Sequence, residues 1–303
     1  MDSLIFDKSG LLRSGWRAGV FLVAFSFVAL LLGTFSQMVI ATLQIETAPG
    51  SATSLLSNAV LSLIPAVMIG WASGKLFERL PFRALGVAFT DGWIKHFGIG
   101  LTLGAATLAF AVLIASIFGG VRFALNDSDG AAAIAASIGL SFLIFAVASA
   151  FEEALFRGYI LQTFARSGLA WLAILLTSVF FGAVHLGNPN ANLISTLNTI
   201  LAGVWFGVAY LKTRDLWFVW GLHLMWNWMQ GSIFGIEVSG LTEITTSPLL
   251  REIDSGPTWL TGETYGLEGG IVCTIAIALS IAAIHFLPGL TPDNELVEMT
   301  TEH

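Results

Sequence analysis

Four polar residues in otherwise apolar segments have the side chains needed for hydrolysis. Glu152, His185, His223 and Asn227 lie in three separate runs rich in Ala, Leu, Ile, Val and Phe. A carboxylate and a neutral imidazole beside one water can act as a general base, taking a proton from the water as it attacks a carbonyl. A second histidine and an asparagine can donate hydrogen bonds to the oxyanion that develops. The set could therefore hydrolyse an amide without a covalent intermediate.

The same side chains leave a second chemistry open. Two histidines and one glutamate are a known catalytic zinc set, so Glu152, His185 and His223 could instead hold a metal ion. Against this, the HExxH pattern is absent, and the three donors come from three separate segments. We expect no cofactor, with zinc as the alternative.

Spacing within ASAFEEALFRGY, residues 148 to 159, assigns different tasks to its two glutamates. In a helix, residues four apart share a face, whereas adjacent residues point about 100° apart. Glu153 can therefore pair with Arg157, which reduces the cost of burying both. Glu152 points elsewhere and has no partner within its own helix, so it is the carboxylate available for chemistry.

Depth in the membrane predicts that the polar residues meet. Residues four apart also form shared faces in the other two segments, Phe181 with His185 and His223 with Asn227. At about 1.5 Å per helical residue, Glu152 and His185 reach a similar depth in the membrane, and His223 and Asn227 lie close to that depth. A charge near the membrane centre costs about 2.5 to 3.5 kcal/mol, so such residues indicate function. We expect one cavity shared by all four side chains.

The elements that position these residues are membrane helices. Of the 303 residues, 55% are hydrophobic and 11% are charged, which argues against a soluble globular protein. About 20 apolar residues cross roughly 30 Å of hydrocarbon. The sequence predicts an all-α fold with a single membrane domain over residues 1–303. Its last residues, 289–303, are expected to form an acidic cytoplasmic tail. The eight expected helices are about 18–42, 54–76, 96–119, 131–165, 168–186, 191–211, 215–235 and 268–288.

Charge distribution predicts the orientation. All but two of the thirteen Lys and Arg residues, Arg122 and Arg251, fall on one side of the expected membrane. The positive-inside rule then places a multi-pass protein in the plasma (inner) membrane with both termini in the cytoplasm. The net charge of −7 comes mostly from the segment 237–268 and the tail, which we expect to be solvated, and no basic stripe indicates nucleic acid.

The remaining polar and small residues of the apolar segments have structural interpretations. Asn198 is expected to join helices, His285 to lie at the membrane interface, and the single Cys273 to be a small buried hydrophobe. The spacing of Gly100 and Gly104 predicts a close contact between helices.

Three sequence blocks resemble the motifs of one family. EEALFR at 152–157, FGAVH at 181–185 and HLMWN at 223–227 look like the EExxxR, FxxxH and HxxxN motifs of the CAAX protease and bacteriocin-processing (CPBP, or Abi) family of intramembrane proteases. The order of the blocks also matches, and the resemblance covers about 80–288. The stretch TGETYGLEGG is a weaker likeness. An eight-helix bundle similar to the Ras-converting CaaX endopeptidase is implied.

The resemblance also implies a mechanism and a substrate class. Glu152 and His185 would activate water, while His223 and Asn227 stabilise the oxyanion. The substrate would be a membrane-associated protein or peptide. The supporting residues would be Glu153, Arg157 and Phe181.

Two functions of other classes stay open. The polar cavity could bind a partner in a non-proteolytic membrane scaffold or bacteriocin-immunity protein. Alternatively, the buried carboxylates could relay ions in a transporter. The absence of evident inverted repeats and of broken helices in matching halves counts against the transporter.

Overall fold

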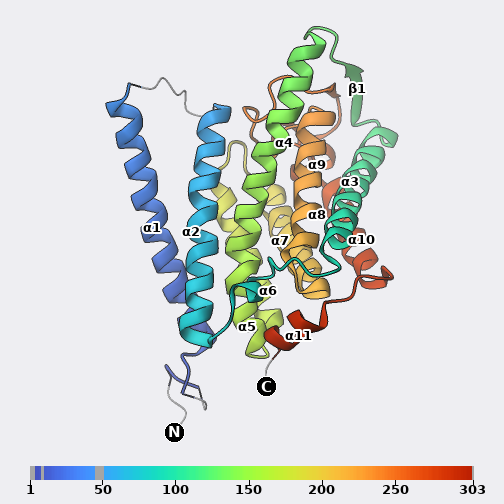
Figure 1. Cartoon of the computed structure of the whole chain (residues 1–303). Helices are drawn as coiled ribbons and strands as arrows, with labels where there is room; N and C mark the ends of the chain where they lie inside the picture. Colours follow the sequence, from blue (N-terminus) through green and yellow to red (C-terminus); the bar gives the residue numbers. More distant parts are fainter. Residues whose placement is uncertain (1–3, 8–9, 45–50, 302–303) are drawn as a thin grey trace.

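The computed structural model describes residues 4–7, 10–44 and 51–301. Within these ranges, six helices are long and apolar enough to cross a membrane, and Figure 1 shows them arranged as one bundle. The predicted segment that carries Glu152 is part of the longest helix, Ala131–Arg166, which changes locally to a π-helix. The six are α1 (Ser14–Thr42), α2 (Ala52–Glu78), α3 (Trp93–Ile117), α4 (Ala131–Glu153) continued by η2 (Ala154–Leu161) and α5 (Gln162–Arg166), α6 (Ala170–Val184) continued by η3 (His185–Gly187), and α7 (Leu193–Thr213).

The last two predicted helices are shorter than expected. Helix α8 (Leu216–Trp228) passes into a π-helical turn, η4 (Met229–Ile233), and α10 spans only Ile271–Phe286. Leu287 is extended because it precedes Pro288, which disfavours a helical conformation in the residue before it. The bundle therefore has six helices of spanning length among the described residues, together with the shorter apolar helix α10 and with α8, so the predicted count of eight spans stays a prediction.

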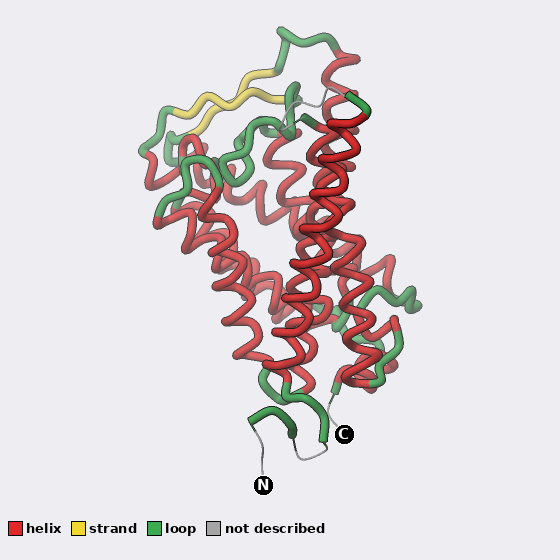
Figure 2. The backbone as a smooth tube through the Cα atoms, turned by 90° about the vertical axis from the view of Figure 1, so that its left-hand side faces the viewer, coloured by secondary structure: helices red, strands yellow, loops and turns green. Residues whose placement is uncertain are grey.

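The all-α prediction needs one correction. Strands β1 (Val121–Leu125) and β2 (Leu250–Asp254) form an antiparallel ribbon, with Val121 opposite Asp254. The ribbon crosses one end of the bundle (Figure 2), which we call the ribbon end. Each strand has five residues and its partner is distant in the chain, so neither shows a clear pattern of its own. The remaining short helices are η1 (Phe82–Leu85), α9 (Thr258–Thr261), η5 (Glu263–Tyr265), η6 (Leu267–Gly269) and α11 (Asn294–Thr300).

Helix α8 lies almost directly on the backbone of α3. A Cβ atom added at Gly100 would lie 2.2 Å from the carbonyl oxygen of Phe218, and one added at Gly104 would lie 2.3 Å from that of Leu222. From the other side, a Cβ at Gly221 would lie 2.6 Å from the carbonyl oxygen of Phe97. The predicted close contact is confirmed, and it leaves α8 no room to shift toward α3.

Side-chain caps define where the next two helices of the site begin. Asn192 accepts hydrogen bonds from the backbone N–H groups of Ile194 and Ser195 at the start of α7. Asp215 accepts one from the backbone N–H of Phe218 at the start of α8, and it also contacts the His96 ring of α3. Such caps satisfy N–H groups that have no partner within the helix.

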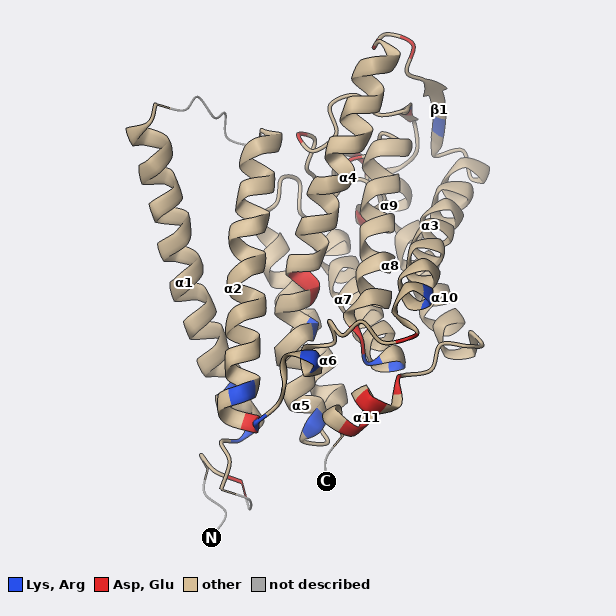
Figure 3. Ribbon diagram, viewed as in Figure 1, with Lys and Arg blue, Asp and Glu red and all other residues tan. Residues whose placement is uncertain are grey.

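The end opposite the ribbon is rich in charge. Lys and Arg residues gather there (Figure 3), near the start of α1 and near α11. Arg17 lies 2.5 Å from Glu78, and Arg166 lies 2.7 Å from the other carboxylate oxygen of Glu78. Arg17, Glu78 and Arg166 thus join α1, α2 and α5, and each of the three side chains is less than 10% exposed.

The C-terminal segment is more ordered than a solvated tail. Residues Asn294–Thr300 form α11, which Asp293 caps by accepting from the backbone N–H of Glu295. Leu296 is fully buried, and Glu295 lies 2.6 Å from Arg83. The prediction of an acidic tail over 289–303 overlooked two buried apolar side chains, Leu290 and Leu296. Residues 302–303 lie outside the described ranges.

Candidate active site

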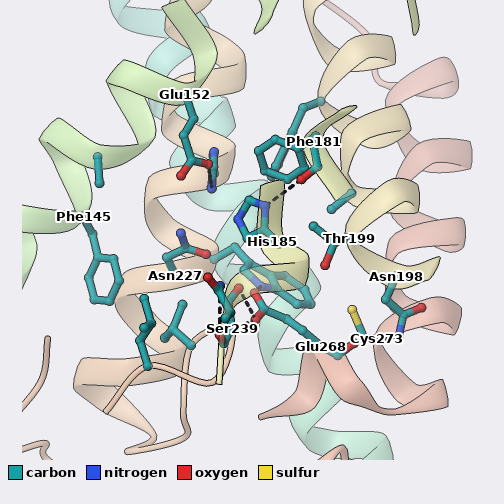
Figure 4. Close-up of a pocket in the computed structure, with 18 of the residues that line it drawn as sticks. Phe145, Glu152, Phe181, His185, Asn198, Thr199, Asn227, Ser239, Glu268 and Cys273 are labelled. Carbon is teal, nitrogen blue, oxygen red and sulfur yellow. Dashed lines mark hydrogen bonds and ion pairs between the residues drawn. The ribbon is translucent and has the colours of Figure 1, made fainter. Parts of the chain in front are cut away.

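A cavity of about 120 Å³ lies among α4, α6, α7, α8 and α10. Its lining includes Glu152, His185, His223 and Asn227, and Figure 4 shows three of these facing one another. By the same measure one buried water needs roughly 10–15 Å³, so several waters fit. The structure thus brings all four predicted residues to one space, which we call the site cavity.

The two adjacent glutamates face different surroundings. The Glu153 side chain is 1% exposed, and its Oε1 lies 3.1 Å from Nη1 of Arg157, so the predicted ion pair is confirmed. The Glu152 side chain is 25% exposed and lines the cavity. One glutamate therefore belongs to the protein interior, and its neighbour belongs to the space that water can enter.

Arg157 has further partners that make its burial tolerable. Its Nη2 donates to the carbonyl oxygen of Gly203 at 2.9 Å. The guanidinium carbon lies 5.2 Å from the ring centroids of both Phe181 and Phe206. Burying an ion pair costs free energy, which hydrogen bonds and cation–π contacts of this kind offset. Phe181 thereby supports the site through Arg157 as well as through its own helix.

His223 connects the two glutamates, a contact between helices that helical spacing alone did not reveal. Its Nδ1 lies 2.8 Å from Oε1 of Glu153, and its Nε2 lies 3.7 Å from Oε2 of Glu152. Its ring stacks on Phe206, with the centroids 4.4 Å apart. An ionised carboxylate can only accept, so Nδ1 carries the hydrogen of this bond.

His185 is held in one tautomer by its own helix. Its Nδ1 lies 2.7 Å from the carbonyl oxygen of Phe181, and the two rings pack with centroids 4.6 Å apart. A backbone carbonyl can only accept, so Nδ1 carries the hydrogen and Nε2 of the neutral ring is the acceptor. His185 lies where α6 ends in the single turn η3. A base at this position can take a proton through Nε2.

Glu268 lines the same cavity, which corrects the expectation that residues 237–268 are solvated. Its Oε2 accepts from the backbone N–H of Ser239 at 2.5 Å and from the Ser239 hydroxyl at 2.8 Å. Its Oε1 accepts from the indole N–H of Trp226 at 3.2 Å. Burial raises the pKa of the Glu268 carboxyl. Sequence reasoning missed its role, although the weak likeness of TGETYGLEGG covers it.

Two other residues of the lining agree with their structural interpretations. Asn198 of α7 donates to the carbonyl oxygens of Glu268 and Gly270, at 2.8 and 2.9 Å, and so joins α7 to the start of α10. Cys273 is buried. His285 lies exposed near the end of α10 and outside the cavity lining.

Across the described residues, no three His, Cys, Asp or Glu side chains are grouped so as to hold a metal ion. Glu152, His185 and His223 line one cavity, but they do not form such a group. The expected absence of a cofactor and the zinc alternative both stay predictions.

Comparison with known families agrees with the motif resemblance. Residues 133–229 match the family model described as type II CAAX prenyl endopeptidase Rce1-like. No curated protein matches the chain. The matched segment runs from α4 to the end of α8 and contains Glu152, His185, His223 and Asn227. With its six helices of spanning length, the protein is a multi-pass integral membrane protein. Over the segment 133–229, the chain is therefore similar to the CAAX protease family, and the match supports an assignment to it.

Proposed function

We propose that the protein is an intramembrane endopeptidase that hydrolyses a peptide bond of a membrane-associated protein or peptide. The observation that carries this proposal is the meeting of Glu152 with His185, His223 and Asn227 in one cavity that holds several waters. Packing alone does not require two histidines, a glutamate and an asparagine at one site. A peptidase of the CAAX type is also what the family match suggests.

In the first step, Glu152 takes one proton from a water molecule in the cavity, while Nε2 of His185 accepts a hydrogen bond from the other hydrogen of that water. The water oxygen attacks the peptide carbonyl carbon, and the carbonyl π electrons move to oxygen to give a tetrahedral oxyanion. Glu152 suits this role because it is the less buried of the two glutamates. The tautomer of His185 is already set by the Phe181 carbonyl, so Nε2 is ready to accept.

The oxyanion then needs donors. Asn227 supplies its side-chain amide, and His223 supplies Nε2–H. Because Nδ1 of His223 already donates to Glu153, donation from Nε2 requires a hydrogen on each ring nitrogen. The carboxylates of Glu152 and Glu153, 3.7 and 2.8 Å from the ring nitrogens, stabilise that positive ring. When the intermediate collapses, the C–N bond breaks and the stored proton passes to the leaving amine.

Topology follows the charge distribution. We propose eight spans, with α8 and α10 as the two short ones, and both termini in the cytoplasm of a cell whose plasma membrane holds the protein. The gathering of Lys and Arg at the end opposite the ribbon supports this orientation (Figure 3). Labelling of terminal tags in intact and permeabilised cells tests it, since tags reached from outside intact cells contradict it.

The decisive experiment is proteomics of cleaved membrane peptides from cells with the wild type or Glu152→Gln. Glu298→Gln, which changes an exposed carboxylate near the C-terminus, is the matched control. We expect a set of cleaved peptides that disappears in Glu152→Gln and persists in Glu298→Gln. Identical sets of cleaved peptides in the wild type and both variants contradict the proposal. If the protein's effect on the cell survives Glu152→Gln, a scaffold or immunity role is supported instead. Metal analysis of the same purified sample, with activity measured after chelation, tests the zinc alternative.

A further inference from the structure

A second cavity lies beside the site cavity, toward the ribbon end. It measures about 200 Å³ and lies among residues 231–248, just before β2. Glu237, Thr242 and Thr245 give it a polar lining, and Thr242 is exposed at the surface. We call it the ribbon-end cavity. Thr242, a polar residue of the connecting segment, thus lies both in the lining of this cavity and at the surface.

Four apolar side chains line both cavities, namely Phe145, Val238, Leu241 and Ile244. Phe145 and Val238 are 2% and 5% exposed. We call this set the apolar partition, because these four side chains separate the two cavities. Apolar constrictions of this kind exclude water until their side chains move apart.

Two members of the partition belong to one tight turn. The backbone N–H of Leu241 donates to the carbonyl oxygen of Val238 at 2.9 Å. The central residues, Ser239 and Gly240, have φ angles of 52° and 77°, as in a type I′ turn. A serine in the left-handed region is unfavourable unless its surroundings hold it there. The turn therefore needs external support.

Glu268 supplies much of that support. Both hydrogen-bond donors of Ser239, the backbone N–H and the hydroxyl, point at one Glu268 oxygen (Figure 4). The carbonyl oxygen of Ser239 accepts from Asn188 at 3.1 Å. The backbone N–H of Gly240 donates to the carbonyl oxygen of Tyr265 at 3.0 Å. Contacts with Glu268, Asn188 and Tyr265 thus hold the turn, and we call these contacts the latch. The latch fixes the positions of the two neighbouring residues, Val238 and Leu241.

The latch also reaches the proposed catalytic helix. The second oxygen of Glu268 accepts from Trp226, the residue before Asn227 on α8. One carboxylate thus binds the turn that carries the partition and the helix that carries the oxyanion donors. A movement of the turn and the geometry of the site are coupled through Glu268.

We propose that the apolar partition is a gate, with Glu268 as its positioning residue, through which water and other small polar molecules pass between the ribbon-end surface and the site cavity. Only the use of this water in peptide hydrolysis rests on the proposed function. The gate itself does not. It is a property of the two cavities and the turn between them, so its test needs no turnover.

Cys273 is a built-in reporter for this gate. It is the single cysteine of the chain, and it lines the site cavity but not the ribbon-end cavity. Protein in lipid nanodiscs, which leave both membrane faces open, is treated with a cationic reagent, trimethylammonium-ethyl methanethiosulfonate, or with neutral methyl methanethiosulfonate. Intact-protein mass gives each labelling rate. The ratio of the cationic to the neutral rate reports the polar route and cancels changes in the reactivity of the thiol.

Leu241→Ala makes one side chain of the apolar partition smaller, and Glu268→Gln weakens the hydrogen bonds that Ser239 donates to residue 268. We expect each to raise the rate ratio roughly 5- to 30-fold, as the loss of one or two packing or hydrogen-bond contacts would do. Leu249→Ala is the matched control, because this leucine is in the same segment, is 38% exposed and lines neither cavity. Cys273→Ser gives the background. Ser239→Ala, which removes only the hydroxyl donor, replaces Glu268→Gln if that variant does not fold.

An unchanged ratio in Leu241→Ala and in the latch variant overturns the gate. An equal rise in Leu249→Ala also overturns it, because general loosening would then explain the result. A raised ratio together with membrane peptides that Glu152→Gln leaves unchanged would uphold the gate and contradict the peptidase, so the two proposals fail separately.

Discussion

His223 donates the hydrogen on Nδ1 to Glu153, with the two atoms 2.8 Å apart. The same oxygen of Glu153 lies 3.1 Å from Arg157, so one buried carboxylate serves two cations or donors from different parts of the bundle. Glu153 is therefore more than the partner of an ion pair within one helix. It connects the segment that carries Glu152 to the helix that supplies the proposed oxyanion donors.

We expect Glu153→Ala to reduce both stability and turnover. It leaves Arg157 fully buried without its carboxylate, which typically costs about 3–5 kcal/mol, and it frees the His223 ring. Glu152→Ala should abolish turnover while the free energy of unfolding stays near that of the wild type. Denaturant unfolding in detergent and cleavage of an identified substrate measure the two effects. Equal stability in both variants would contradict the division of tasks.

Asn227→Ala should lower kcat with little change in KM. An oxyanion donor acts on the transition state, and its removal typically costs about 10²- to 10³-fold in kcat. Asn198→Ala is a useful comparison, because that side chain lines the same cavity but its amide is engaged by Glu268 and Gly270. Its replacement should lower thermal stability. A larger effect on KM than on kcat for Asn227→Ala would argue against the oxyanion role.

Gly104→Ala should displace α8 and reduce turnover. The added methyl group would lie 2.3 Å from the backbone oxygen of Leu222, and overpacking of this kind typically costs about 1–3 kcal/mol. Gly98→Ala, on the same helix, has no atom within 4 Å of the new methyl group, and alanine favours a helix. We therefore expect Gly98→Ala to keep wild-type stability and activity. Thermal unfolding and cleavage assays on the pair measure this difference.

The ribbon end should loosen as the pH rises. Burial, and then the charges of Glu237 and Asp254, raise the pKa of Glu252 on β2 from 4.5 to about 8. A raised pKa means that the fold favours the protonated carboxyl. The stability it contributes is complete below pH 4.5 and is lost as the pH rises through about 8.

Hydrogen exchange of the β1 and β2 amides, corrected for the intrinsic pH dependence of exchange, measures this loosening. Glu252→Gln should remove the pH dependence. Glu263→Gln, which changes an exposed carboxylate of the same connecting segment, should leave it in place. Protection that increases between pH 5 and pH 9 would contradict the sign.

Helical spacing was sufficient for the contacts that lie within one helix. Glu153 and Arg157 are four residues apart, so their pairing and the different direction of Glu152 follow from helix geometry. The bond from His223 to Glu153 joins residues 70 positions apart, and no local pattern encodes it. The same holds for Glu268, which reads as one more acid in a polar loop until the loop folds back onto Ser239 and Trp226.

Two other differences between the predicted and the observed fold also come from contacts between distant residues. The β1–β2 ribbon is formed by short strands that are stable only as a pair, so each alone resembles a loop. Leu296 of α11 is buried through contacts with distant parts of the chain, which the acidic composition of its segment hides. Apolar length predicts where the membrane helices are, whereas long-range contacts decide which polar residues of the connections take part in the site.

The contact of α8 with α3 sets a minimum size for a working unit. A polypeptide trimmed to residues 133–229 would keep Glu152, His185, His223 and Asn227. It would lose α3, whose glycines are the surface on which α8 rests, and it would lose the carboxylate that holds Trp226. The part of the chain that identifies the family is thus smaller than the part that must fold together for its residues to meet, and shortened versions should keep the motifs but lose the site.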